Sequence, residues 1–250
     1  YTTERPIYEV NFFYTLMMEK ALYEVETENV KWDGAIVWEF YNMGFVIKTR
    51  QTTFAFDLVR PGYVPLPPLT QTQIASLAEV LDVLFISHTH TDHCDPSVIR
   101  AMIEAGKKIV FPAGILDNLV SRGLPRESPQ YVPINAGETK IVSGLRVTAY
   151  EGEHGLPIIM YCFLVETPTG VTVFHTGDQQ VNQPWMSDVG ADYDIDILLI
   201  NVWLNDGWGK QQAIEAVPQA IMKFNPAVVI PGHVNELWHP PGPGAADRYG

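Results

Sequence analysis

Histidines and acids are concentrated in one short stretch of this chain, SHTHTDHCD at positions 87–95. It contains three of the seven histidines, His88, His90 and His93, together with Asp92. Imidazoles and carboxylates are the side chains that bind Zn²⁺ and similar ions, and a catalytic site keeps one coordination position open for water. Residues i and i+2 of an extended segment point the same way, so His88 and His90 can bind one ion together. The stretch therefore predicts a metal site.

The cluster is too small to be the whole site. A lone histidine is more often a hydrogen-bonded structural residue than a ligand, but four ligand-type side chains at this spacing favour metal binding. After the chain turns, Asp92 and His93 can face a second ion. Zinc sites usually have four ligands, so four side chains divided between two ions leave each ion short. Further ligands must come from elsewhere in the chain.

Three later residues can complete the site. His154 in EGEHG, Asp178 in FHTGD and His233 in IPGH each follow a predicted strand and lie close to a glycine. Glycine allows backbones to approach closely, and loops at strand ends are where binding side chains gather. We therefore expect these residues to join the cluster. His175, also in FHTGD, is expected to support the ligands from behind, to touch substrate, or simply to bond to backbone at its strand end.

The hydrophobic pattern predicts the first elements that position these residues. A helix is predicted over about residues 8–29, because apolar residues recur there at three- and four-residue steps: Phe13, Leu16, Met17, Ala21 and Val25. The short runs IVWEF, FVIKT and TFAFDL predict an antiparallel meander that ends at Asp57. A proline-rich loop follows, and then a helix near Gln73–Leu81. The strand VLFIS should run directly into the histidine cluster.

The rest of the chain alternates between helices and strands. Pro96 is placed to start a helix through about Ala105, and another helix is expected near Ile115–Ser121. Pro218 falls within a helical pattern, so that helix is predicted to begin or bend there. The predicted strands are KIVF, LRVTAY, YCFLVE, VTVFH, IDILLIN and AVVIP. This pattern predicts one α/β domain over residues 1–250.

Composition narrows the function classes. The chain is 46% hydrophobic and 18% charged, and no apolar run reaches the roughly 18 residues of a membrane helix, so we expect a soluble protein. The net charge of -13 disfavours nucleic acid as a partner, because such binding depends on Lys and Arg. The chain starts at Tyr1 rather than Met, so a cytoplasmic location and, if a leader was removed, a periplasmic or secreted one both stay open. Oligomeric state is not predicted.

The ligand pattern resembles the signature of the metallo-β-lactamase superfamily, which is HxHxDH followed at a distance by His, Asp and His. The resemblance runs from the meander ending at Asp57 to His233. It implies an αββα sandwich, in which two mixed sheets pack face to face between helices with the metal site along one edge. It also implies that Asp57 orders the HTHTDH loop through hydrogen bonds.

The same resemblance implies a dinuclear centre. His88, His90 and His154 would bind one divalent ion, and Asp92, His93 and His233 would bind the other. Asp178 would bridge the two. Zinc is the expected metal, with manganese, iron and cobalt as alternatives, because imidazole and carboxylate ligands accept all four.

Details of the motif separate branches of this family. The diiron oxygen-reducing branch carries Glu where this chain has His90, so the pattern here is that of the hydrolases. The Gly-Gly that usually follows the motif in glyoxalase II and acyl-homoserine lactonases is missing, and Val181 stands where the latter carry Tyr. The sequence is more similar to the branch containing ascorbate-6-phosphate lactonase and the N-acylphosphatidylethanolamine phosphodiesterase.

These features predict a hydrolase that uses a metal-bridging hydroxide on a small ester, lactone or amide, with Asp92 passing a proton to the leaving group. One alternative is a phosphodiesterase acting on a small or lipid phosphodiester. Another is a noncatalytic metal-binding module that keeps the fold. Tyr63, Trp203 and Trp208 are predicted to line the substrate site, although core packing explains such aromatics equally well.

Overall fold

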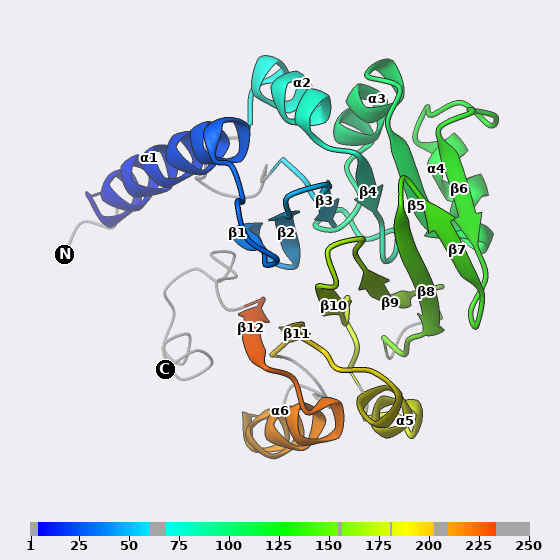
Figure 1. The fold of residues 1–250 in the computed structure, drawn as a ribbon. Helices are drawn as coiled ribbons and strands as arrows, with labels where there is room; N and C mark the ends of the chain where they lie inside the picture. Colours follow the sequence, from blue (N-terminus) through cyan, green and yellow to red (C-terminus); the bar gives the residue numbers. More distant parts are fainter. Residues whose placement is uncertain (1–4, 61–68, 155–156, 181, 203–209, 234–250) are drawn as a thin grey trace.

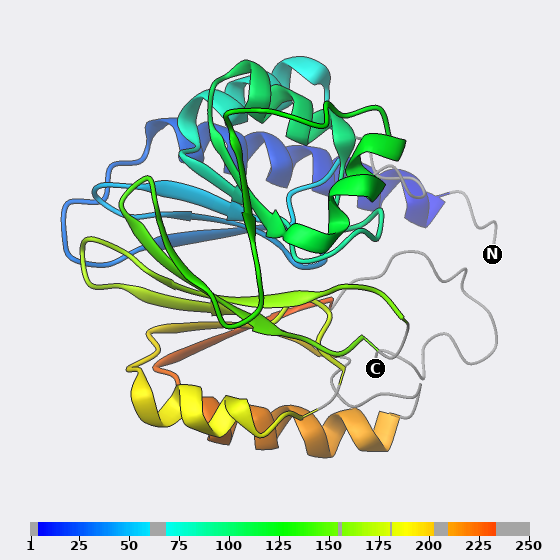
Figure 2. The ribbon, with the colours of Figure 1, turned by 90° about the vertical axis from the view of Figure 1, so that its right-hand side faces the viewer.

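Two six-stranded sheets lie face to face, and helices cover their outer surfaces (Figures 1 and 2). The computed structural model describes the chain except for residues 1–4, 61–68, 155–156, 181, 203–209 and 234–250. Both sheets contain parallel and antiparallel strand pairs. The predicted αββα sandwich is therefore confirmed.

The first sheet has the strand order β1-β2-β3-β4-β5-β6. Its first three strands pair antiparallel, which confirms the predicted meander. Its last three continue parallel to β3. The strands are β1 (Ile36–Tyr41), β2 (Gly44–Lys48), β3 (Thr53–Phe56), β4 (Val83–Phe85), β5 (Lys108–Pro112) and β6 (Tyr131–Ile134).

The second sheet has the order β12-β11-β10-β9-β8-β7. Strands β7 to β10 pair antiparallel, and β11 and β12 then continue parallel to β10. Strands β8, β10, β11 and β12 consequently point the same way. The strands are β7 (Thr139–Val142), β8 (Leu145–Glu151), β9 (Tyr161–Glu166), β10 (Thr172–His175), β11 (Ile197–Asn201) and β12 (Val228–Gly232).

Helices form the two outer layers (Figure 2). The first sheet is covered by α1 (Arg5–Thr27), α2 (Gln71–Val80), α3 (Pro96–Glu104), the short turn η1 (Ala113–Ile115) and α4 (Leu116–Ser121). The second is covered by α5 (Trp185–Asp192) and α6 (Lys210–Phe224). Pro218 lies inside α6, so the helix does not begin there. Among the helices of the described ranges, none is long and apolar enough to cross a membrane.

Alternating side chains on the strands produce this layering, because successive residues of a strand point to opposite faces. Phe54 and Phe56 of β3 enter the core between the sheets, whereas Ala55 faces the helices. In β9, Phe163 enters the same central core and Leu164 packs under the helices of the second sheet. Both faces of each sheet are therefore apolar, and the polar site is confined to an edge.

Helix α1 differs from its prediction in which residues it buries. Val25 is buried as expected, but Leu16 and Met17 are 45% and 42% exposed. The side chain of Phe13 lies outside the described part of the chain. The N-terminal half of α1 projects past the sheet, so within the described residues its apolar spacing has no sheet surface to pack against there (Figure 1). A face predicted from spacing assumes a partner along the whole helix.

Candidate metal centre

The candidate ligands meet at one edge of the sandwich, because strands that run in one direction end at the same edge. The HTHTDH loop (residues 88–93) follows β4, which is parallel to β3. His154, Asp178 and His233 follow β8, β10 and β12, which share one direction in the second sheet. Topology thus brings together all seven residues that the sequence singled out as metal ligands.

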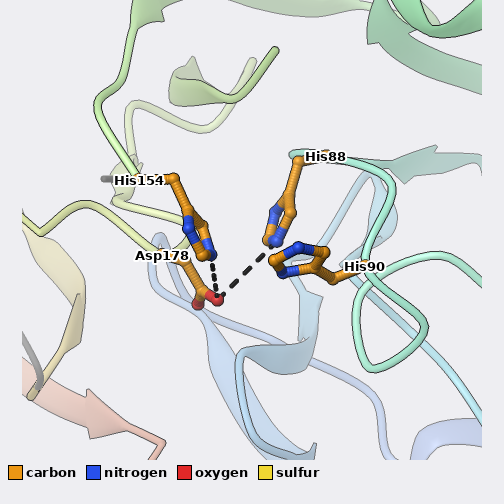
Figure 3. A group of neighbouring side chains, drawn as sticks. All are labelled: His88, His90, His154 and Asp178. Carbon is orange, nitrogen blue, oxygen red and sulfur yellow. Dashed lines mark hydrogen bonds and ion pairs between the residues drawn. The ribbon is translucent and has the colours of Figure 1, made fainter. Parts of the chain in front are cut away.

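Four of these side chains form a first group, His88, His90, His154 and Asp178, whose ligand atoms all lie within 4.8 Å of one another (Figure 3). Asp178 Oδ2 lies 3.2 Å from His154 Nε2 and 3.6 Å from His88 Nε2. The His90 ring stands edge-on to both other rings, with centroids 4.7 Å from His88 and 4.6 Å from His154. Three imidazoles and a carboxylate can thus surround one ion.

A second group contains Asp92, His93, Asp178 and His233, again with ligand atoms within 4.8 Å of one another. Asp178 Oδ1 lies 2.8 Å from His233 Nε2, and its Oδ2 lies 3.1 Å from His93 Nε2. Asp92 Oδ2 lies 3.4 Å from His93 Nε2. Asp178 therefore belongs to both groups, and its two oxygens can serve different neighbours.

Burial and charge set the protonation of these groups. Burial lowers the pKa of His88, and the nearby His93 lowers it further, to well below the ordinary histidine value. Burial also lowers the pKa of His93, but the carboxylates of Asp178 and Asp92 outweigh it and the net pKa is well above the ordinary value. Burial raises the pKa of Asp178, but His233 and His93 hold it well below the usual carboxyl range. A neutral His88 and an ionised Asp178 are the forms that bind metals, and an ion beside the same carboxylates would displace the proton that they favour on His93.

The donor atoms suit a divalent cation. Within the described residues no group forms a hydrogen bond with the buried Nε2 of His88, although buried polar atoms in proteins are nearly always paired. The other ring nitrogen, Nδ1, lies 2.9 Å from Ser87 Oγ, and this contact orients the ring toward the group. Imidazole and carboxylate ligands accept Zn, Mn, Fe or Co. The residues present therefore fit an ion in each group.

Asp57 supports the HTHTDH loop from inside the protein. Its side chain is fully buried, and its Oδ1 accepts the backbone N–H of Ser87 at 2.7 Å. Its Oδ2 accepts Ser87 Oγ at 2.5 Å and His93 Nδ1 at 2.8 Å. A proton held on Nδ1 leaves Nε2 of His93 as the nitrogen that faces the second group. Asp57 thus fixes both the start of the loop and the orientation of a ligand ring.

Two glycines allow the loops to approach one another. A Cβ on Gly177 would lie 3.0 Å from Ser87 Cβ, and the φ of +52° at Gly177 also favours glycine. A Cβ on Gly232 would lie 2.9 Å from the carbonyl oxygen of Asn42. The glycines of FHTGD and IPGH are therefore needed for contact between the second-sheet loops and the first sheet.

His175 lies behind the ligands and not among them. It is fully buried, its Nε2 donates to the Met43 carbonyl at 3.0 Å, and its Nδ1 accepts the Gly177 N–H at 3.2 Å. Its ring stacks on Phe56 with a centroid distance of 4.5 Å, and Nε2 is 4.0 Å from Asp57 Oδ2. Both nitrogens are thus bonded to backbone, which is one of the three roles the sequence left open.

No cysteine belongs to the described ligand groups, and the predicted substrate-lining residues fall outside the described part of the chain. Tyr63, Trp203 and Trp208 lie outside the described residues, so their predicted substrate role stays a prediction. Cys94 adjoins His93 in sequence but belongs to neither group, and burial raises the pKa of its thiol to about 12.

Sequence patterns did not single out three residues that contact the HTHTDH loop. Ser87 bonds to Asp57 as described above. Arg122, at the end of α4, donates to the carbonyls of Thr89 and Cys94. Asn42, in the turn between β1 and β2, donates to Asp92 Oδ2 at 3.1 Å. Asn42 carries a weak signal, since NMG is recognisable as a turn, but nothing in the sequence links Arg122 to the loop.

Comparison with known proteins agrees with this architecture. A family model described as "Beta-lactamase superfamily domain" matches residues 42–234. A curated relative from Roseiflexus sp. (strain RS-1), described as a UPF0173 metal-dependent hydrolase, is 26% identical over 166 residues. That match covers 62% of this chain and 65% of the relative, which is less than two thirds of its length.

Solved structures share the fold. Igni18, described as a novel metallo hydrolase from the archaeon Ignicoccus hospitalis, superposes with a TM-score of 0.62 at 21% identity, over 80% of this chain and 83% of that one. CmlA, described as a diiron beta-hydroxylase from Streptomyces venezuelae, gives a TM-score of 0.57 at 18% identity, over 82% of this chain and 45% of that one. At these identities the likeness concerns the fold, which proteins named for different chemistries share.

Proposed function

Because the chain belongs to the metallo-β-lactamase superfamily, we propose that it is a metal-dependent hydrolase with a dinuclear centre. Zinc is the metal that we expect there. The observation that carries the proposal is the pair of four-residue groups that share Asp178. His88, His90 and His154 would hold one ion, Asp92, His93 and His233 the other, and Asp178 both. A noncatalytic module would have no need to keep two complete ligand groups.

Divalent ions held in this way supply Lewis acidity, which lowers the pKa of a bound water from 15.7 toward about 7 and polarises a substrate oxygen. The protein supplies the remaining functions. The Asp92 side chain is 23% exposed, whereas those of His93 and His233 are 0% and 1% exposed. Of these three, Asp92 is therefore the residue that can reach substrate, and we assign it the transfer of a proton to the leaving group.

The charge distribution favours a small ester, lactone or amide as substrate. The chain carries a net charge of -13, which disfavours anionic substrates. Two arginines near the HTHTDH loop are already engaged: Arg60 pairs with Asp95 at 3.2 Å, and Arg122 bonds to loop carbonyls. Neither is free to bind a phosphate. The branch that the motif resembles contains a lactonase as well as a phosphodiesterase, so the preference for carboxyl substrates rests on the charge distribution.

A substrate panel tests the proposal. Protein reconstituted separately with Zn²⁺, Mn²⁺, Co²⁺ and Fe²⁺, with metal content measured, is assayed on lactones, aryl esters, amides, β-lactams and bis(p-nitrophenyl) phosphate. We expect turnover of at least one carboxyl substrate, its loss on chelation and its return on adding metal. Faster hydrolysis of the phosphodiester than of every carboxyl substrate would replace the proposed substrate class with the phosphodiesterase alternative.

The zinc-loaded, oxygen-free arm of the same panel separates hydrolysis from oxidation. Hydrolysis needs only water and a Lewis acid, so activity should persist in zinc-loaded protein without O₂. Activity that requires iron and O₂ would overturn the proposal and align the chain with the chemistry for which CmlA is named. Fully metallated protein that turns over no member of the panel would also count against hydrolysis.

A further inference from the structure

Asn42 occupies an unusual position beside the second group. It lies in the turn between β1 and β2, is only 5% exposed, and has a φ of +53°. Residues with a Cβ rarely adopt this left-handed backbone, although asparagine tolerates it better than most. The turn stands at the edge where the ligand loops meet, because β1 runs parallel to β3 in the first sheet.

Asn42 bonds to two members of the second group that come from different sheets. Its side-chain Nδ2 donates to Asp92 Oδ2 at 3.1 Å, in the HTHTDH loop. Its backbone carbonyl accepts the N–H of His233 at 3.2 Å, at the end of β12. Asp92 and His233 are far apart in sequence, and Asn42 holds both. Gly232 makes this contact feasible, because a Cβ there would lie 2.9 Å from the Asn42 carbonyl oxygen.

The chemistry of the contact fixes which end of the amide faces Asp92. An ionised carboxylate only accepts hydrogen bonds, so the NH₂ end must point toward it. Within the described residues, the other amide atom, Oδ1, is buried without a hydrogen bond. The left-handed backbone accounts for asparagine or glycine at this position, but an unpaired buried acceptor lowers stability, so backbone conformation alone does not explain why the amide is kept. The side chain is better explained by what its donor end does to Asp92.

We propose that Asn42 is a positioning residue for the second ion, setting Asp92 and His233 at the spacing that this ion requires. The inference rests on the proposed dinuclear centre and deepens it. Among the described residues, Asn42 forms no hydrogen bond with a member of the first group, so the first ion should bind independently of it. Residues that orient metal ligands from behind typically change metal affinity by about 10- to 100-fold when removed.

Stepwise titration with Co²⁺, followed by its visible absorption and by competition with a chromophoric chelator, measures both affinities. Asn42→Gly accepts the left-handed backbone and keeps the carbonyl bonded to His233, so it removes the amide alone. We expect its second-ion affinity to fall by about 10- to 100-fold with the first-ion affinity unchanged. Asn225→Gly is the matched control, because Asn225 has a φ of +46° at the exposed end of α6, and it should bind both ions normally.

Asn42→Ala separates positioning from stability. It loses the same amide as Asn42→Gly but strains the left-handed backbone, so it should melt at a lower temperature and yet show the same second-ion affinity as Asn42→Gly. The inference is overturned if Asn42→Gly binds the second ion like wild type, if affinity follows melting temperature across the two variants, or if wild type binds only one ion. Wild type that binds two ions without hydrolytic activity would remove the proposed function and leave the inference standing.

Discussion

The two sheets contribute ligands in different ways. After β4 the first sheet provides four of them, His88, His90, Asp92 and His93, within six residues of a single loop. The second sheet provides three, and each comes from a separate strand end after β8, β10 or β12. One half of the centre is thus a local motif, and the other half exists only because the strands are arranged in this order.

This difference predicts how the centre fails. Each group takes two ligands from the HTHTDH loop, so substitutions that disturb the loop should weaken the binding of both ions. His154 belongs only to the first group and His233 only to the second, so substitution of either histidine should weaken the binding of one ion. Asp178 is the exception within the second sheet, because both groups include it.

Removal of Asp178 should have the largest effect. Asp178→Ala takes the shared carboxylate from both groups and leaves its imidazole neighbours without their anionic partner. We expect loss of both ions, measured by elemental analysis after dialysis, and turnover reduced by more than about 10³-fold, since losing one transition-state-stabilising group already costs about 10²- to 10³-fold. A variant that keeps one tightly bound ion would show that Asp178 is not shared.

Substitution of the two strand-end histidines should separate the ions. His233 has a φ of +59°, so asparagine is the replacement that preserves its backbone, and His154→Asn is made to match. Each variant should lose affinity for one ion by more than the roughly 10- to 100-fold that a supporting residue is worth. In double titrations with Co²⁺, the ion lost in His154→Asn should be the one kept in His233→Asn. Loss of affinity for both ions in either variant would show that the strand ends of the second sheet do not serve separate ions.

The same difference explains what the sequence could predict. The HTHTDH motif is visible by spacing alone, since an extended loop dictates which side chains point together. The later ligands are predictable because each follows an apolar run and stands near a glycine, and Gly177 and Gly232 do lie where a Cβ would crowd the neighbouring loop or strand end. Which strands are neighbours could not be derived from these local patterns, and that step came from the resemblance to a known family.

Two edge strands and one helix were missed. β6 and β7 each end a sheet, carry several exposed or half-exposed residues, and were not predicted as strands. A proline interrupts the sequence of β6, YVPI, and two polar residues begin that of β7, TKIV, whereas the other two edge strands, β1 and β12, carry longer apolar runs and were predicted. Helix α5 was also missed, and Gly190 within it allows a close approach to α6, since a Cβ there would meet the Lys223 carbonyl. The contacts of Asn42 and Arg122 depend on side-chain geometry that no local pattern encodes.

Asp57→Asn should lower the affinity for both ions by a moderate amount. Asn is close in size and tolerates the φ of +44° at this position, but its NH₂ group cannot accept the bonds that Asp57 accepts from Ser87 and His93. We expect both affinities to fall by about 10- to 100-fold. The measurement is the same two-step titration. Loss confined to the second ion would mean that Asp57 acts through His93 alone and does not order the loop.

Of the four predicted changes, loss of Arg122 should have the smallest effect. It should still lower the affinity for both ions. Its guanidinium joins the carbonyls of Thr89 and Cys94, so it braces the loop backbone without touching a ligand side chain. Arg122→Ala should reduce stability by about 1–3 kcal/mol, since bonds from a charged donor contribute in that range. For a chain of this size, that corresponds to a melting temperature lower by about 2–12 °C.

Ion binding by Arg122→Ala tests whether Arg122 supports the HTHTDH loop or contributes only to overall stability. Asp57 and Asn42 still hold the loop in this variant, so each ion should bind within about tenfold of its wild-type affinity, with equal losses for the two. Arg126→Ala is the control, because Arg126 is exposed, pairs only with the exposed Asp117 among the described residues, and should change neither property. Unequal losses of affinity for the two ions in Arg122→Ala would show that the loop does not act as one unit. The contrast between the single ligand loop of the first sheet and the separate strand ends of the second would then be wrong for the first sheet.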